Sequence, residues 1–277
     1  MKRLALSLLT ATSLLFTPAL AAASPASGSQ SLAVSASGVD PRWAQPGPSA
    51  VKVKVLANHT LYYPATLTGR RPVVLWGNGT FEVPESYGGL LRHLASHGFI
   101  VAAANTEQSG SGTEIKAGID LLAGFDRDPG SEFYRHVDLE HIGASGHSQG
   151  GAGAINAGQD QRVDTTVPIQ PGPLAAPGQL KGPALFLSGS YDLIVLPLLV
   201  QLMWLLAPQV PAVYGSLRGA THPEATGDGG GFRGVVTAWF AYQLTGNSAA
   251  AAEFTGPGCG LCTDSAWTDV RRNAKAS

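Results

Sequence analysis

Six short apolar runs constrain the fold of this chain more than any other feature of its sequence. Each run has five to seven residues and no Asp, Glu, Lys or Arg, a pattern typical of strands buried on both faces of a parallel sheet. Segments of helical length follow five of them, at 85–97, 113–125, 148–158, 194–206 and 234–244. This alternation predicts one α/β domain with a doubly wound, mostly parallel sheet and helices on both faces. The runs lie at 72–76, 99–105, 141–145, 165–170, 184–189 and 212–217.

The chain begins with the three-part pattern of a secretory signal peptide. Lys2 and Arg3 precede an apolar run at 4–16, and small residues follow it as far as Ala23. The apolar run is too short to span a membrane comfortably. We therefore expect a signal peptide at 1–23, its cleavage, secretion of the mature protein and no stable membrane span.

The next segment, 24–50, is rich in Ser, Ala, Gly and Pro and has little apolar periodicity, which predicts a flexible N-terminal segment. A single folded domain is expected at 51–277, and it opens with an antiparallel strand pair at 51–57 and 60–65. A formal net charge of −1 gives no basic surface for nucleic acid, so we expect no nucleic-acid partner.

The two cysteines, Cys259 and Cys262, lie close together near the end of the chain. In an exported protein an even number of cysteines favours a disulfide, and a structural disulfide is our interpretation. A redox C-x-x-C pair is the alternative, but it should open a helix beside a βαβ unit. We predict no metal site, because zinc would need further ligands, and His93 and His97 also lack a third ligand nearby.

The segment from Gly146 to Gly150 matches the G-x-S-x-G pattern of a nucleophile elbow, with Ser148 at its centre. An apolar run precedes it and a helical segment follows, which is the strand–turn–helix context that such an elbow requires. The two glycines leave room where backbone approaches the serine closely. Ser148 is the predicted nucleophile; a glycine turn with an idle serine is the alternative.

The order of residues after Ser148 predicts its partners. In folds built on this elbow, an acid and then a histidine follow the serine, and His222 is the one histidine after Ser148. Asp192 is the predicted acid, because it comes just after a predicted strand, where α/β enzymes place catalytic groups. Asp160 and Asp164 precede the next strand, where a capping or solvated carboxylate is the ordinary role.

Two backbone amides are predicted to stabilise the oxyanion of a tetrahedral intermediate. One is the N–H of Gln149, directly after the nucleophile, and the other comes from the loop after an early strand. In that loop we favour the Thr80 amide, with a neighbouring amide as the alternative. We assign no proton-transfer role to His147, beside the nucleophile.

The stretches LASHGFIV and GHSQGG form a specific combination, and TLYYPA, PVVLWGNGT, GPALFLSGSYD and LRGATH accompany them in order. In these residues the chain, from about residue 60 to about residue 270, resembles the secreted α/β-hydrolase group that contains actinobacterial lipases, cutinases and PET hydrolases, with plant-type chlorophyllases as a relative. The resemblance implies an α/β-hydrolase fold with Ser148, Asp192 and His222 as the triad, and Thr80 and Gln149 at the oxyanion hole.

Three positions depart from the polyester hydrolases of this group. They carry an aromatic residue where this chain has Thr80, a methionine where it has Gln149, and a tryptophan where it has Gly172. Three contacts for a terephthalate ring are therefore absent. These departures argue against PET itself as the substrate and leave ester hydrolysis unaffected.

The segment after Asp192, at 193–208, is unusual because Gln201 is its one polar side chain. A helix that is apolar all round is normally buried, so core packing is one interpretation. The other is that part of the segment lines an acyl pocket or meets a lipid surface beside the active site.

Together these features predict a secreted serine esterase that forms an acyl-enzyme, needs no cofactor and acts as a monomer on a small-molecule, lipid or polymer ester. Two other enzymatic activities are alternatives. One is acyl transfer to an alcohol with the same triad, and the other is polyester hydrolysis of the cutinase or PET type. A silent binding module on the same fold is the non-enzymatic alternative.

Overall fold

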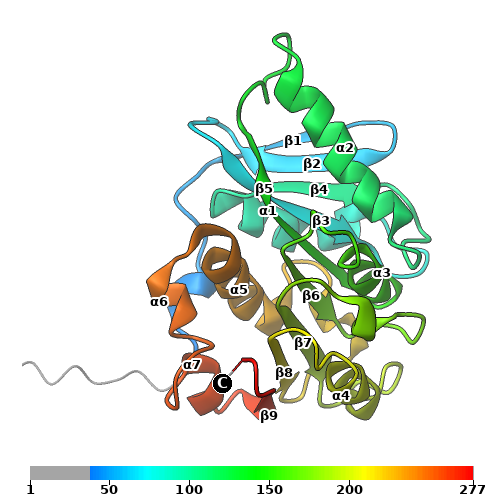
Figure 1. Cartoon of the computed structure of the whole chain (residues 1–277), viewed down its shortest axis with the longest axis vertical. Helices are drawn as coiled ribbons and strands as arrows, with labels where there is room; N and C mark the ends of the chain where they lie inside the picture. The colour runs from blue at the N-terminus through cyan, green and yellow to red at the C-terminus, as the bar shows by residue number, and fades with distance from the viewer. Residues whose placement is uncertain (1–37, 277) are drawn as a thin grey trace, which may run out of the picture. The chain divides into compact units, whose positions relative to one another are not determined.

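A computed structural model describes residues 38–276, and this part of the chain forms one mixed sheet with helices on both faces (Figure 1). Its nine strands lie in the order β1-β2-β4-β3-β5-β6-β7-β8-β9. The strands from β4 to β8 run parallel to one another, while β1, β2 and β9 pair antiparallel at the two edges. The strands are β1 (Val51–Val55), β2 (His59–Pro64), β3 (Arg71–Gly77), β4 (Ile100–Ala104), β5 (Val137–His147), β6 (Thr165–Ile169), β7 (Ala184–Gly189), β8 (Ala212–Leu217) and β9 (Trp267–Arg272).

The helices form two layers, one on each face of the sheet. On β3, Val74 and Trp76 face the core that contains α1 and α5, whereas Val73 and Leu75 face the core that contains α2 and α3. Both sets are fully buried because side chains alternate between the faces of a strand. The helices are α1 (Gly88–Ser96), α2 (Thr113–Arg127), α3 (Gln149–Ala157), α4 (Pro197–Leu205), α5 (Arg233–Thr245), α6 (Ser248–Ala251) and α7 (Gly260–Thr263).

The predicted fold class is therefore confirmed: a single α/β domain with a mostly parallel sheet. Each of the six apolar runs forms a strand, and each of the five helical segments contains a helix. The sequence did not predict β9, a polar edge strand, or the short helices α6 and α7. No helix within residues 38–276 is long and apolar enough to cross a membrane.

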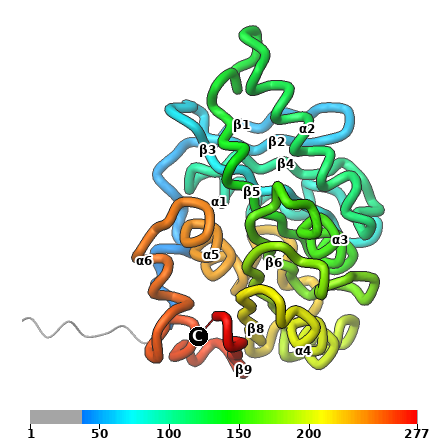
Figure 2. The backbone as a smooth tube through the Cα atoms, viewed as in Figure 1, coloured from blue at the N-terminus to red at the C-terminus, as the bar shows by residue number. Residues whose placement is uncertain are grey.

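The N-terminal segment differs from its prediction where the structure describes it. The predicted signal peptide and residues 24–37 lie outside the described residues, but residues 38–50 pack against the domain beside α5 (Figure 2). The indole of Trp43 is buried, and its Nε1–H donates to Glu253. His93 and His97 hydrogen-bond to the carbonyls of Trp43 and Gln45, so the two histidines hold this segment against α1. The domain accordingly begins before Val51.

Trp43 provides a test of this boundary. Trp43→Ala should lower the free energy of unfolding by about 3 kcal/mol, because it removes a large buried side chain and leaves a cavity. Trp43→Phe should lose less, since it keeps the apolar contacts and gives up the hydrogen bond to Glu253. Urea denaturation measures both. An unchanged midpoint for Trp43→Ala would show that residues 38–50 lie outside the cooperative unit.

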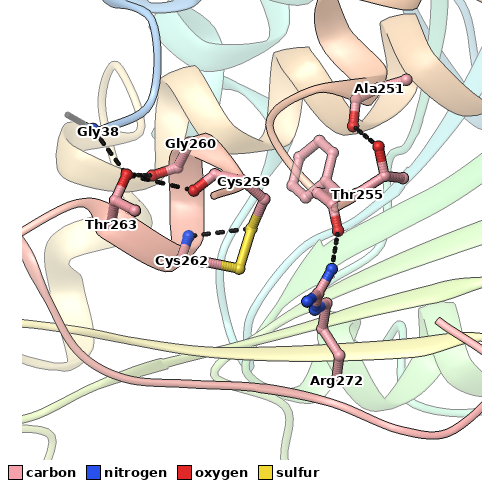
Figure 3. The surroundings of a disulfide bond; sticks show 9 residues. Gly38, Ala251, Thr255, Cys259, Gly260, Cys262, Thr263 and Arg272 are labelled. Carbon is pink, nitrogen blue, oxygen red and sulfur yellow. Dashed lines mark hydrogen bonds between the residues drawn. A yellow bond between two sulfur atoms is a disulfide. The ribbon is translucent and has the colours of Figure 1, made fainter. Parts of the chain in front are cut away.

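The structure contains the disulfide between Cys259 and Cys262, which closes the short helix α7 (Figure 3). Cys259 is buried against the core of α5. The Thr263 hydroxyl beside the disulfide accepts a hydrogen bond from the amide of Gly38. The bridge therefore lies where the N-terminal segment meets the C-terminal end of the domain, which supports a structural role.

Candidate active site

Ser148 lies at the sharp turn between the end of β5 and the start of α3. Its backbone has φ 55° and ψ −121°, a conformation that a residue with a side chain adopts only when its surroundings impose it. A Cβ atom on Gly146 would collide with the carbonyl of Gly150, and one on Gly150 would collide with the carbonyl of Gly77. Glycine is therefore required at both positions that flank the serine.

The three side chains predicted from chain order meet at this turn. His222 Nε2 lies 3.0 Å from Ser148 Oγ, and His222 Nδ1 lies 2.8 Å from Asp192 Oδ2. The Asp192 side chain is completely buried and that of His222 is largely buried. A carboxylate can only accept, so Nδ1 carries the proton and Nε2 is free to accept the serine hydroxyl proton. This arrangement can turn Ser148 into a nucleophile.

Asp192 is held by four hydrogen bonds. Its Oδ1 accepts from the amides of Ile194 and Val195, both at 2.9 Å, and its Oδ2 accepts from His222 and from Gln170 Nε2 at 2.7 Å. Gln170 is fully buried after β6, has φ 45° and also donates to the carbonyl of Thr221. Gln170 could not be predicted from the sequence, because no local pattern shows that a glutamine after one strand will face an aspartate after the next.

The other two aspartates considered from the sequence lie elsewhere. Asp160 pairs with Arg162 on the surface, and this guanidinium lowers the pKa of the Asp160 carboxyl to about 2. Asp164 accepts from the amide of Ile142 at the start of the inner part of β5. Both have the ordinary structural roles expected of them, and neither reaches His222.

The loop after β3 leaves one amide available near the nucleophile. The amide of Asn78 donates to Ser109 Oγ, that of Gly79 to the Tyr87 hydroxyl and that of Phe81 to the Glu107 carbonyl. Within residues 38–276 the Thr80 amide has no hydrogen-bond acceptor, and Thr80 lines the cavity at Ser148. These contacts support the choice of Thr80 over its neighbours as an oxyanion donor.

The second predicted donor, the Gln149 amide, lies at the first residue of α3. Amides in the first turn of a helix have no acceptor inside the helix, and the helix dipole favours negative charge there. The Gln149 side chain has another partner, since its Nε2 donates to Gln108 Oε1. Its backbone amide is thus available to an oxyanion on Ser148.

Two cavities meet at Ser148. The larger, of about 630 Å³, extends along Ala152, Pro173, Leu174 and Val195 and is mostly apolar. The smaller cavity, of about 450 Å³, is lined by His222, Pro223 and Tyr87 among other residues. Ser148, Thr80 and Ile194 line both. A substrate whose reacting carbon lies at Ser148 can therefore place one substituent in each cavity.

Comparison with known proteins assigns the family. A family model described as PET hydrolase-like matches residues 41–201, which include Ser148 and Asp192 and end before His222. The chain belongs to the PET hydrolase-like family. A bis(hydroxyethyl) terephthalate hydrolase of Streptomyces coelicolor is 28% identical over 130 residues, and this match covers 44% of the present chain and 40% of that protein. The chain thus matches less than half the length of this relative, and the predicted family and fold are confirmed.

The larger cavity of this PET hydrolase-like protein lacks aromatic side chains. Among the described residues that line the larger cavity, none is aromatic: Thr80, Gln149 and Gly172 all lie there. Phe81 follows Thr80, but its ring is exposed and is absent from both cavity walls. The three departures noted in the sequence therefore fall on the cavity wall itself.

The apolar segment after Asp192 is divided between core and surface. Val200, Met203 and Trp204 are buried against β7 and β8, and the Trp204 indole donates to the Ala212 carbonyl. Leu198 and Leu202, on the opposite side of α4, are 61% and 45% exposed. Core packing thus accounts for the apolar residues on the inner side of α4 and leaves those on its outer side unexplained. The exposed apolar side chains form what we call the α4 surface: Leu193, Ile194, Leu196, Leu198, Leu199, Leu202, Leu205 and Leu206.

Proposed function

We propose that this protein is a carboxylic ester hydrolase that works through an acyl-enzyme on Ser148. The observation that carries the proposal is the hydrogen-bonded series of Ser148, His222 and Asp192 at the meeting point of two cavities. Membership of the PET hydrolase-like family supports the same chemistry. No cofactor is needed for it. The disulfide supports export to an oxidising compartment.

The geometry supports a two-step reaction. Ser148 Oγ attacks the ester carbonyl while its proton passes to His222 Nε2, and Asp192 stabilises the imidazolium that forms. The amides of Thr80 and Gln149 stabilise the negative oxygen. His222 then gives the proton to the departing alkoxide, which leaves as the alcohol. A water molecule, deprotonated by His222, then attacks the acyl carbon, the bond to Ser148 Oγ breaks, and His222 returns the proton to Ser148 as the acid leaves.

The cavity walls favour aliphatic acyl esters as substrates. The larger cavity offers Ala152, Leu174, Ile194 and Val195 to an acyl chain and no aromatic side chain to a terephthalate ring. The name of the Streptomyces relative nevertheless favours a terephthalate ester as a second candidate. A small ester of this type needs less contact with the protein than a polymer does.

A substrate panel tests the proposal. Purified protein is assayed on p-nitrophenyl esters from acetate to palmitate, on a triglyceride emulsion, on bis(hydroxyethyl) terephthalate and on PET film. We expect hydrolysis of aliphatic esters and little release from PET. Absence of hydrolysis on every substrate would favour a silent binding module. Formation of a new ester when an alcohol is added would identify acyl transfer in place of hydrolysis.

We further propose that the α4 surface meets water-insoluble ester substrates. Ile194 belongs both to this surface and to the walls of the two cavities, so the surface continues into the site. Buried Val200 and Trp204 fix α4 to the sheet, which makes the surface a rigid platform. A lipid phase that covers it would present ester groups directly to Ser148.

Substitution of the exposed leucines tests this contact. The activity of the triple variant Leu198→Ser, Leu202→Ser, Leu205→Ser on emulsified long-chain esters should fall by about tenfold or more. Each leucine that the lipid phase covers contributes about 1.5–3 kcal/mol to the binding of the protein to that phase. Activity on soluble acetate esters should stay the same. The matched control is Val55→Ser, an exposed apolar residue on the distant edge strand β1. Equal losses on both substrates would contradict the proposal.

A further inference from the structure

A buried chain of hydrogen bonds joins the oxyanion loop to the loop that carries His222. The Gly79 amide lies 3.0 Å from the Tyr87 hydroxyl, and this hydroxyl lies 3.0 Å from His147 Nδ1. His147 Nε2 lies 2.9 Å from the carbonyl oxygen of His222. Tyr87 and His147 are both buried. Neither residue has a part in the ester hydrolysis described above.

The fixed donors and acceptors restrict the protons of this hydrogen-bond chain. The Gly79 amide can only donate, so it donates to the oxygen of Tyr87, and the His222 carbonyl can only accept, so His147 carries a proton on Nε2. Burial disfavours a charged imidazole and lowers the pKa of His147 to about 3, which makes the ring neutral. Its Nδ1 therefore has a lone pair and accepts from the Tyr87 hydroxyl, which confines His147 to one tautomer.

The two ends of this hydrogen-bond chain are next to the groups that perform the chemistry. Gly79 directly precedes Thr80, whose amide is the proposed oxyanion donor, and the His222 carbonyl belongs to the proposed general base itself. The His147 ring also packs against the rings of Tyr87 and His222, with centroids 5.8 and 4.6 Å apart. The distance between donor and base thus depends on two side chains that line the smaller cavity and make no hydrogen bond to Ser148.

The loop that carries His222 is held by hydrogen bonds at two consecutive carbonyls. Gln170 Nε2 donates to the Thr221 carbonyl at 2.9 Å, and His147 Nε2 donates to the next one, at His222. Gln170 comes from the end of β6 and His147 from the end of β5. Gln170 ties the loop to Asp192, whereas His147 ties it to the oxyanion loop through Tyr87.

We propose that Tyr87 and His147 are positioning residues that hold the oxyanion donor of Thr80 in register with the base His222. Neither transfers a proton during the reaction. The inference rests on the proposed ester hydrolysis. The two loops approach Ser148 from different strands, and these hydrogen bonds fix the position of one loop relative to the other. Their relative position matters because displacement of a reacting group by about 1 Å can lower the rate about 100-fold.

Kinetics of single variants test the inference. Tyr87→Phe breaks two links of the chain and should lower kcat by about 10- to 100-fold while KM changes less than about twofold, because the loss falls on the transition state. His147→Leu should have a similar effect. The double variant should lose little more than either single variant, since both interrupt the same chain. Tyr214→Phe, which removes a buried hydroxyl bonded to Ser188, is the matched control.

A conservative variant separates positioning from proton transfer and from general damage to the fold. His147→Gln supplies one acceptor and one donor and should recover part of the activity that His147→Leu loses. The acid limb of its pH profile for kcat/KM should match that of wild type. A shifted acid limb would assign His147 to proton transfer, and equal losses in the Gln and Leu variants would remove the hydrogen bonds as the cause. Either result overturns the inference.

A measurement without substrate separates this inference from the proposed function. In ¹⁵N-histidine NMR spectra, His147 should show the Nε2–H tautomer and stay neutral down to about pH 5, in keeping with its buried state. Tyr87→Phe should shift the resonances of His147 and His222. An Nδ1–H tautomer, or an unmoved His222, would overturn the inference whatever the activity. If wild type hydrolyses no ester, the proposed function fails and these spectra alone decide whether the two loops are coupled.

Discussion

Replacement of Ser148 by alanine is expected to abolish ester hydrolysis, with kcat reduced by about 10⁴-fold or more. Alanine keeps the Cβ atom and the strained backbone of the elbow but has no oxygen to attack the carbonyl. His222 and Asp192 remain hydrogen-bonded to each other, so the fold should keep its stability. Initial rates on p-nitrophenyl butyrate and thermal unfolding measure the two quantities.

Ser145→Ala is the matched control for this experiment. Ser145 lies on β5, the strand that ends just before Ser148, is buried, and donates its hydroxyl to the Val167 carbonyl. Its loss should reduce stability by about 1 kcal/mol and leave kcat nearly unchanged. A fluorophosphonate probe should label wild type and Ser145→Ala and fail to label Ser148→Ala. Undiminished hydrolysis by Ser148→Ala would show that another residue is the nucleophile.

The sheet could be predicted from the sequence because its inner strands are buried on both faces. This requirement excludes charged residues from the buried part of each inner strand, so that part is visible as an apolar run. The edge strand β9 escaped prediction because one of its sides faces solvent and its sequence, from Trp267 to Arg272, is largely polar. Residues 38–50 escaped for a similar reason. Their order comes from contacts of Trp43 with residues about 50 and 210 positions away, which leave no local periodicity.

The predicted triad residues come together, whereas their supporting residues could not be foreseen. Chain order restricted the base to His222 and left Asp192 as the best acid, so counting and strand position were sufficient. Tyr87, His147 and Gln170 act through contacts between loops that only the folded sheet brings together. For helix α4 the composition left both burial and a role at the surface open, and the structure divides it: α4 packs on β7 and β8 and leaves its outer side exposed.

Replacement of Asp192 by asparagine is expected to lower kcat by about 10⁴-fold with the fold intact. Asp192 accepts at both oxygens, from two backbone amides at Oδ1 and from His222 and Gln170 at Oδ2. Asparagine has one oxygen and one NH₂ group. If its NH₂ group faces the amides of Ile194 and Val195, three donors meet with no acceptor. The NH₂ group is therefore expected to face His222 and Gln170, because the imidazole can change its tautomer and the Gln170 side-chain amide can rotate to present its oxygen, whereas the two backbone amides can only donate.

In that orientation His222 Nδ1 must accept a hydrogen bond, so the imidazole proton moves to Nε2 and points at Ser148. The base then has no lone pair for the serine hydroxyl, and the imidazolium loses its carboxylate. Asp160→Asn is the matched control, because it removes a carboxylate bonded to Arg162 on the surface and should leave kcat unchanged. Rates on p-nitrophenyl butyrate and the ¹⁵N spectrum of His222 provide the measurement. Full activity with the Nε2–H tautomer present would exclude His222 as the base, whereas loss of activity in both asparagine variants would point to a general effect of charge.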